Sequence, residues 1–217
     1  MIELLEHCGS DNTIANTARV SMELGGGWNE LPEDYSEEQR NKLITYLATH
    51  NHTSPFRHNS ITIRCNVPIF LARQLGKHQV GMSWNEVSRR YVDTDVTFFV
   101  PEEWRSKPDG SIKQGSAGVH EYSEEHTEGY NNHLQHCLGY YNFLLEDGVA
   151  PEQARMVLPQ SMMTQFVWTG SLYAFVHVYK LRVDAHAQQE AQDFAIELDK
   201  IIRPLFPVSW PTLVDPC

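Results

Sequence analysis

The feature that most constrains the fold is a strict alternation of apolar and polar side chains between Asn59 and Val67. Ile61, Ile63 and Cys65 share one side of an extended chain with Val67, and the residues between them are polar. A period of two residues is typical of a β-strand with one buried and one solvated face. We therefore expect a half-buried strand here, paired into a sheet with one face toward the core.

The other patterns mix helices and strands without a regular alternation of the two. The run Ser36-Glu37-Glu38-Gln39 is typical of a capping box at a helix start, and Pro68 suits the first turn of a helix that continues through Leu75. Further helices are predicted over 134–145, from Pro151, over 172–179 and over 187–201, and strands over 96–100 and 164–169. No phosphate-binding glycine motif follows a strand. The predicted fold class is therefore α+β, with a mixed sheet flanked by helices in a single domain, residues 1–217.

One segment of the domain is rich in turn-forming residues. Residues 106–119 contain the runs Pro108-Asp109-Gly110-Ser111 and Gly115-Ser116-Ala117-Gly118. Such clusters of Gly, Pro and Ser are typical of loops, so we predict a mobile surface loop over 106–119.

Composition indicates an ordinary globular protein. The chain has 217 residues, of which 41% are hydrophobic and 21% charged. No run approaches the roughly 20 apolar residues of a membrane span, and the N-terminus lacks the pattern of a signal peptide. The four cysteines, Cys8, Cys65, Cys137 and Cys217, show no CxxC spacing. We therefore expect a reduced, cytoplasmic protein without a membrane partner.

The net charge of −11 argues against a protein that binds nucleic acid, because such binding depends on neutralising phosphates. It does not argue against an enzyme that binds a nucleotide, which needs only a few local cations. Arg73, Lys77, Arg89 and Arg90 supply such a local cluster.

That cluster surrounds the segment richest in chemistry, Lys77 to Tyr91. Basic, amide, carboxylate and hydroxyl side chains lie close together here, and apolar Val80, Met82, Trp84 and Val87 alternate with them. Arginine offers planar donor forks to phosphates and carbonyl oxygens, and Asn and Glu can read the edge of a heterocycle. A partly buried binding segment is therefore favoured over a solvated loop.

The segment resembles the signature of the flavin-dependent thymidylate synthases. That family carries Arg-His-Arg followed by Ser-x-Asn-Glu-x-Ser-x-Arg-Tyr, and the second half is present as Ser83-Trp84-Asn85-Glu86-Val87-Ser88-Arg89-Arg90-Tyr91. The first half departs from the pattern, because Lys77-His78-Gln79 stands in place of Arg-His-Arg. Further similar elements follow the same order along most of the chain: Ala18-Arg19-Val20-Ser21, Ser54-Pro55-Phe56-Arg57-His58, Leu181-Arg182-Val183-Asp184 and Ala185-His186-Ala187-Gln188.

The resemblance implies a reaction and an assembly. The expected reaction is the reductive methylation of dUMP to dTMP, with 5,10-methylenetetrahydrofolate as one-carbon donor, FAD as cofactor and NADPH as reductant. Tetrahydrofolate, and not dihydrofolate, would be released. The expected assembly is a homotetramer with active sites at subunit interfaces.

No cysteine looks activated for attack on uracil, so the ring has to be activated in another way. Arg182 is the catalytic candidate, because a guanidinium held against the uracil edge stabilises an ionised or enolate-like ring. The alternative is an arginine at a helix end paired with Asp184 or Glu190. Ser88 lacks an adjacent His–carboxylate pair, so it is predicted to contact substrate and not to act as a nucleophile.

The resemblance implies two further sets of site residues. Those expected at dUMP are Gln74, Lys77, Glu86, Ser88, Arg89, Arg90, Arg155 and Arg182. Those expected at FAD are Ser54, Lys77, His78, Gln79, Asn85, Glu86, Ser171, Tyr173, His177 and His186. His186 follows Arg182 by four residues, so both are expected on one helical face.

Several flavin-side positions depart from the family. Ser171 and Tyr173 stand where the family often has Asn-x-Arg, and His177 stands where it usually has Asn; His177 is equally consistent with a core histidine. Lysine keeps the charge of arginine but loses the fork, and Gln79 loses the charge, so we expect FAD to bind through altered contacts.

Other functions remain open at this stage. His50, His52 and His58 invite a metal interpretation, but no carboxylate or cysteine completes a ligand set, so no metal site is predicted. The altered flavin-side residues leave two alternatives to thymidylate synthesis. One is a related flavin enzyme that acts on another pyrimidine nucleotide or delivers another group. The other is a nucleotide-binding homologue that has lost catalysis.

Overall fold

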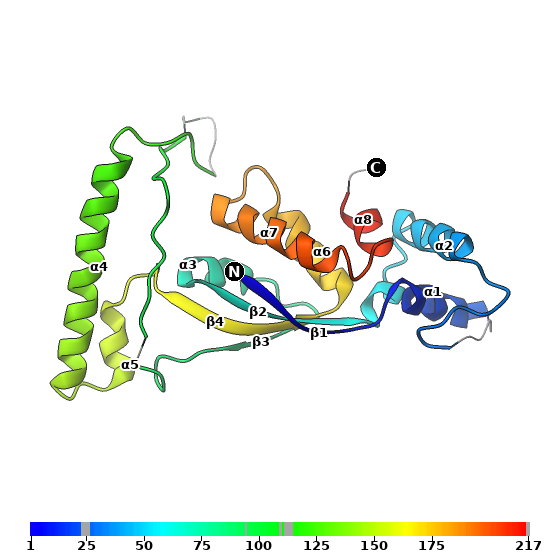
Figure 1. The fold of residues 1–217 in the computed structure, drawn as a ribbon, viewed down its shortest axis with the longest axis horizontal. Helices are drawn as coiled ribbons and strands as arrows, with labels where there is room; N and C mark the ends of the chain where they lie inside the picture. The colour runs from blue at the N-terminus through cyan, green and yellow to red at the C-terminus, as the bar shows by residue number, and fades with distance from the viewer. Residues whose placement is uncertain (23–26, 94, 109, 111–114, 216–217) are drawn as a thin grey trace.

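The computed structural model describes residues 1–22, 27–93, 95–108, 110 and 115–215. Its centre is a four-stranded sheet in the order β1-β2-β4-β3, formed by β1 (Ile2–Cys8), β2 (Ser60–Pro68), β3 (Met82–Glu86) and β4 (Met163–Gly170) (Figure 1). All three pairings are antiparallel. The α+β class is thus confirmed, but the sheet is antiparallel throughout where a mixed one was expected. The reason is that β4 lies between β2 and β3, which run in the same direction, so β4 opposes both.

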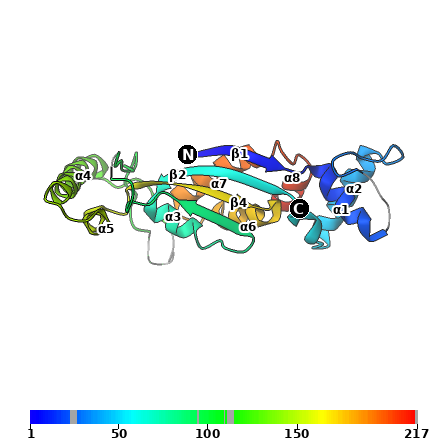
Figure 2. The same cartoon turned by 90° about the horizontal axis from the view of Figure 1, so that it is seen from below.

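Helices cover one face of this sheet. The helices α6 (Leu172–Arg182) and α7 (Gln189–Ile202) lie over it, with α3 (Ile69–Leu75) beside them, and Figure 2 shows the other face without a helix across it. On the covered side, Ile61, Ile63, Cys65 and Val67 of β2 are fully buried. The prediction of a half-buried strand from residue alternation is confirmed.

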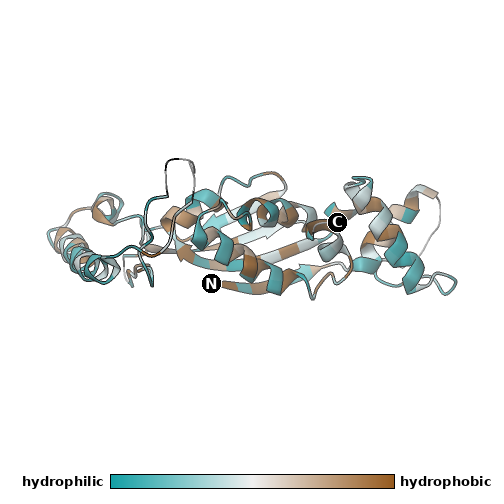
Figure 3. Ribbon diagram, turned by 90° about the horizontal axis from the view of Figure 1, so that it is seen from above, coloured by the Kyte–Doolittle hydropathy of each residue, from teal (hydrophilic) through white to brown (hydrophobic). Residues whose placement is uncertain are grey.

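The molecule extends beyond the sheet at both ends (Figure 1). One end holds α1 (Asp11–Arg19), α2 (Glu37–Thr49) and the short α8 (Ser209–Val214), and the other holds α4 (Ser123–Glu146) and α5 (Pro151–Ala154). Single 3-10 turns span Val20–Met22, Ser54–Arg57 and Arg155–Val157. The long helix α4 buries only Leu134 and Tyr141, and Figure 3 shows it as largely hydrophilic.

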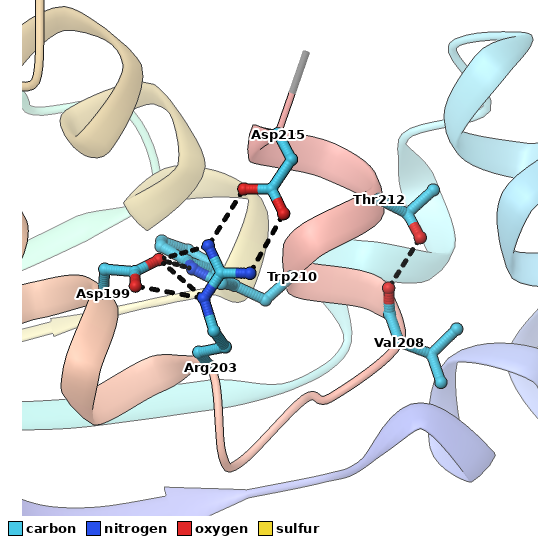
Figure 4. A network of polar contacts seen from close by, with 6 residues as sticks. All are labelled: Asp199, Arg203, Val208, Trp210, Thr212 and Asp215. Carbon is cyan, nitrogen blue, oxygen red and sulfur yellow. Dashed lines mark hydrogen bonds and ion pairs between the residues drawn. The ribbon is translucent and has the colours of Figure 1, made fainter. Parts of the chain in front are cut away.

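Ion pairs and hydrogen bonds between polar side chains hold the C-terminal segment against α7. Arg203 binds Asp199 at 2.8 Å and Asp215 at 2.9 Å, and the indole N–H of Trp210 donates to Asp199 at 2.7 Å (Figure 4). From the opposite end of the sequence, the buried carboxylate of Asp11 accepts hydrogen bonds from the backbone N–H groups of Val208 and Ser209. The first helix and the last are therefore joined directly.

One predicted strand is wrong. In 96–100 the described structure has only an isolated bridge, between Phe98 and Met162. The segment makes two hydrogen bonds with the residues that precede and begin β4, and Pro101 then has no N–H with which to continue the ladder.

The two ends of the loop predicted over 106–119 are hydrogen-bonded to each other. Arg105 forms a bridge with Val119, and the N–H of Ser106 donates to the carbonyl of Gly118. Residues 109 and 111–114 of that loop lie outside the described residues.

The described part of the chain contains no helix with both the length and the apolar character needed to cross a membrane.

Candidate active site

Arg182 is the last residue of α6, and its side chain turns toward α3 and the chain that follows α3. Its Nε donates to Nε2 of His78 at 3.1 Å, and its Nη2 donates to the backbone carbonyl of Gln74 at 3.2 Å. Burial lowers the pKa of the Arg182 guanidinium from its ordinary value. Among the described residues, neither Asp184 nor Glu190 is its hydrogen-bond partner, so the alternative of an ordinary helix-end ion pair is not what the structure has.

His78 is held neutral by this environment. Desolvation, aided by the charges of Arg182 and His177, lowers the pKa of His78 to about 4. Because Nε2 accepts a hydrogen bond from Arg182, the ring proton resides on Nδ1. A neutral acceptor orients the guanidinium without neutralising it, so Arg182 keeps its full charge for a ligand.

A cavity of about 860 Å³ lies where β3 ends and β4 begins. Its lining includes the predicted nucleotide residues Glu86, Ser88, Arg89 and Arg155. Arg89 also donates to the carbonyls of Val92 and Asp95, which closes the turn after β3.

Glu86 is fixed by two neighbours. Its carboxylate accepts from the hydroxyl of Thr164 at 2.7 Å and from the indole N–H of Trp84 at 3.2 Å. It also lines a second cavity, of about 660 Å³. The two cavities therefore meet at Glu86.

The second cavity contains the altered half of the motif. Lys77, His78 and Gln79 line it together with Arg73, and Trp84 and Trp168 form apolar walls. The indole N–H of Trp168 is buried and has no hydrogen-bond partner within the described structure. Cations and aromatic walls suit an anionic, aromatic ligand.

The remaining predicted flavin residues either lie outside the second cavity or are hydrogen-bonded within their own helix. Tyr173 and His177 line a third cavity of about 440 Å³, with their rings perpendicular and 4.7 Å apart. The Ser171 hydroxyl caps α6 by accepting from the N–H of Ala174 at 3.2 Å. Ser54 is exposed in a 3-10 turn.

Several predicted residues do not converge on one cavity. Asn85 and Arg90 are exposed, and Arg90 bonds the Tyr91 hydroxyl at 3.0 Å. The expectation that His186 shares a helical face with Arg182 is wrong, because α6 ends at Arg182. The Asp184 carboxylate instead accepts from the His186 backbone N–H at 2.8 Å, in an Asx-type turn that does not continue the helix.

Some cavity residues were not predicted from the sequence. Arg73, Trp84 and Trp168 line the second cavity, and His52 and Lys180 line the third. The local cluster of cations already contained Arg73 and could have identified it. Trp168 gave no such signal, because its position on the covered face of β4 is typical of a core residue.

The cysteines are not placed for catalysis. Burial raises the pKa of the Cys65 thiol, which lies on the core side of β2. Cys8 lies on β1 and Cys137 on α4, and neither lines the three cavities described above. Cys217 lies outside the described residues.

Known proteins resemble this chain along nearly all of its length. A family model described as "Thymidylate synthase complementing protein" matches residues 3–208. The flavin-dependent thymidylate synthase of Thermosipho melanesiensis is 37% identical over 204 residues, which cover 93% of this chain and 85% of the relative. A flavin-dependent thymidylate synthase of Thermus thermophilus is 36% identical over 209 residues, which cover 96% of this chain and 73% of the relative.

Solved structures agree with the sequence relatives. The UMP/dUMP methylase PolB of Streptomyces cacaoi bound with 5-Br dUMP matches with a TM-score of 0.86 at 29% identity, covering 98% of this chain and 93% of that one. The same methylase bound with 5-Br UMP matches with a TM-score of 0.83 at 28% identity, covering 98% and 92%. From its sequence and its fold alike, this chain belongs to the flavin-dependent thymidylate synthase family.

Proposed function

We propose that this protein methylates dUMP to dTMP, with 5,10-methylenetetrahydrofolate as one-carbon donor and NADPH as reductant. The observation that carries the proposal is the placement of Arg182. It is a partly buried guanidinium oriented by a neutral histidine and a backbone carbonyl, in a protein whose described cysteines are not positioned to attack a ring. We further propose that residues 1–217 act as one domain in the cytoplasm.

In this proposal Arg182 stabilises the negative charge that develops on the uracil ring. A preorganised cation is effective at this task because it does not have to reorient as charge develops. His78 and the Gln74 carbonyl fix the direction of the fork, and partial burial strengthens its field.

The second cavity fits a flavin. Its cations, Arg73 and Lys77, can approach a diphosphate, and Trp84 gives an apolar wall for an aromatic ring. Lys77, His78, Gln79 and Glu86 are proposed to hold the cofactor here, with Ser54, Asn85, Ser171, Tyr173, His177 and His186 as candidates from the wider surroundings. When bound and reduced by NADPH, the flavin would supply the electrons that convert the transferred one-carbon unit into a methyl group, so that tetrahydrofolate is released.

The nucleotide is proposed to bind in the first cavity. Ser88, Arg89 and Arg155 line this cavity and, with Arg90 beside Arg89 in the chain, carry the donors that suit its phosphate. Arg155 comes to the cavity from the 3-10 turn that precedes β4. Lys77, Glu86 and Gln74 are proposed to contact the sugar or base.

A complete site is proposed to need a second copy of the chain. Glu86, Ser88, Arg89 and Arg155 line the first cavity, whereas Arg182, at the end of α6, lines neither that cavity nor the second. A single protomer therefore does not bring all the predicted nucleotide residues to one cavity. This arrangement supports the homotetramer with sites at subunit interfaces that the family resemblance implies.

A second substrate is favoured by a specific observation. The methylase PolB, which shares this fold at a TM-score of 0.83, is described as a UMP/dUMP methylase and has been seen with 5-Br UMP. We therefore propose UMP as the alternative methyl acceptor.

One assay tests both proposals. Purified protein is incubated with FAD, NADPH and 5,10-methylenetetrahydrofolate and with either dUMP or UMP, and the nucleotide and folate products are separated. The expected result is dTMP with tetrahydrofolate. Formation of the ribonucleotide product alone would favour the alternative. A protein that binds dUMP but forms neither product, even when loaded with FAD, would contradict both and would indicate a homologue that has lost catalysis.

A further inference from the structure

A series of hydrogen bonds connects the segment before the 106–119 loop with the residue whose carbonyl orients Arg182. Arg105 donates through Nη2 to the Glu190 carboxylate at 2.6 Å, and Nε2 of Gln188 donates to the same carboxylate at 2.7 Å. The side-chain oxygen of Gln188 accepts from Nε2 of Gln74 at 2.5 Å. The backbone carbonyl of Gln74 in turn accepts from Arg182.

The chemistry of Arg105 and Glu190, the first two residues of the series, allows only one direction for each bond. A guanidinium has no acceptor, and an ionised carboxylate has no donor. Gln188 must therefore turn its NH₂ toward Glu190, which leaves its oxygen for Gln74. Gln74 must then direct its own NH₂ at Gln188, so its amide oxygen remains available as an acceptor for a ligand.

The ionised state of Glu190 is secured by its surroundings. The residue is 7% exposed, at the first turn of α7. Burial pushes the pKa of Glu190 upward, but hydrogen bonds from Arg105, its own backbone and Gln188 outweigh burial, and the pKa ends below its ordinary value. Arg105 also donates to the Ser116 hydroxyl at 2.8 Å. The Arg105 side chain is therefore held both by Glu190 and by the far end of the 106–119 loop.

We propose that Arg105 and Glu190 are positioning residues for the nucleotide. Through Gln188 they fix the Gln74 side chain with its oxygen presented to a hydrogen-bond donor of the pyrimidine nucleotide. This inference rests on the proposed function, in which Gln74 contacts dUMP. Neither Arg105 nor Glu190 touches substrate in this account.

The competing explanation is that Arg105 and Glu190 only attach the 104–120 segment to α7. Glu190→Gln separates the two ideas, because glutamine keeps the size of glutamate while Arg105 can still only donate. The new amide oxygen must then face Arg105 and its NH₂ must face Gln188, which reverses the Gln188 and Gln74 amides. A purely structural attachment tolerates that reversal better than an oriented amide does. Arg105→Met removes the cation, and Arg105→Lys restores a charge that can still donate to Glu190.

The test measures dUMP affinity, flavin content, kcat and melting temperature in full-length protein. We expect Glu190→Gln and Arg105→Met to raise the dUMP Kd on the order of tenfold, as for a lost buried hydrogen bond, while flavin content stays unchanged. Arg105→Lys should recover most of the affinity. The matched control is Arg203→Met, which breaks the ion pairs at the opposite end of the same helix (Figure 4) and should lower the melting temperature without changing the dUMP Kd.

The inference is overturned if Glu190→Gln and Arg105→Met lower the melting temperature but leave the dUMP Kd within twofold of the wild type. Failure of the proposed function looks different, because the wild-type protein itself would then form no dTMP. If it still binds dUMP, the comparison of Kd values stands. If it does not, a double-mutant cycle on unfolding free energy, between Arg105→Met and Gln74→Met, still tests the series. The two residues share no direct hydrogen bond, so non-additive effects support the connection through Gln188 and Glu190, and additive effects overturn it.

Discussion

At the scale of single residues, the site depends on how Arg182 is held. Its two hydrogen-bond partners, His78 and the Gln74 carbonyl, are both uncharged acceptors, so the guanidinium is oriented but not neutralised. An arginine paired with a carboxylate would have lost much of its field to that partner.

This placement predicts that Arg182→Ala lowers the rate of dTMP formation by about 10²–10³, the usual cost of removing a preorganised group at a developing anion. The melting temperature should change little, because the residue ends a helix. Arg182→Lys is the matched control and should retain part of the rate, since it keeps the charge and loses the fork. Single-turnover measurements check both variants, and a near-normal rate in Arg182→Ala would refute the assignment.

The lowered pKa of His78 predicts a pH dependence of stability. The folded value is about 4, against about 6.5 for an unperturbed histidine, so between these values the unfolded chain binds the proton more readily. The stabilisation is fully present above about pH 6.5 and is lost as pH falls toward 4. Because the side chain is only half buried, we discount the effect to on the order of 1 kcal/mol.

Denaturant unfolding at pH 7 and pH 5 tests this dependence. His78→Gln keeps an acceptor for Arg182 but does not titrate, so its loss of stability over the interval should be smaller than that of the wild type. Equal losses in the two proteins would mean that His78 is not held neutral.

At the scale of elements, the short helix α8 depends on α1. The Asp11 carboxylate accepts from the backbone N–H of Val208 at 2.8 Å, from that of Ser209 at 2.9 Å and from the Ser209 hydroxyl at 2.5 Å. A six-residue helix is too short to be stable by itself. The hydrogen bonds to Asp11 and the ion pairs of Arg203 therefore hold α8 against the core.

Asp11→Ala is therefore expected to lower the free energy of unfolding by roughly 2–4 kcal/mol, because buried donors lose their shared acceptor. Asp11→Asn should cost less, since it retains one acceptor oxygen. Urea denaturation with an unchanged m-value would establish the difference as one of stability. A cost below about 0.5 kcal/mol for Asp11→Ala would show that the junction contributes little.

At the scale of the whole molecule, the proposed nucleotide residues of one chain do not share one cavity. Arg155 lines the first cavity, whereas Arg182 lies at the end of α6 and lines neither the first cavity nor the second. In an assembly with composite sites, these arginines would come from different chains.

Mixing two inactive variants tests that division. Arg155→Ala and Arg182→Ala should each be inactive alone, but subunit exchange between them should restore up to a fraction of the wild-type activity, because some composite sites then contain both arginines. Mixing either variant with itself is the control. If no activity returns although mass measurements show mixed oligomers, the two arginines act from the same chain.

The sequence by itself determined the half-buried strand β2, the helix at 37–49, the part of α4 over 134–145, the α+β class and the family signature; the first eleven residues of α4 were not predicted. Each of these depends on a local pattern: alternation, a capping box, apolar periodicity or a contiguous motif. The edge strands β1 and β3 escaped prediction, because edge strands are exposed and carry weak alternation; burial of β1 is only intermittent. The segment 96–100 has good strand composition, yet in the described structure it forms only an isolated bridge, between Phe98 and Met162.

The contacts that give the candidate site its properties were decided by the tertiary structure alone. Arg182 and His78 lie 104 positions apart, and Gln74 and Gln188 lie 114 apart. No local pattern encodes such pairs, because they depend on how α3 and α6 pack over the same sheet face. The same packing makes His78 neutral, since its pKa follows from burial and from the charge of Arg182. Residue types in a motif thus indicate which chemistry is available, and the packing of distant segments sets the ionisation and orientation of each group.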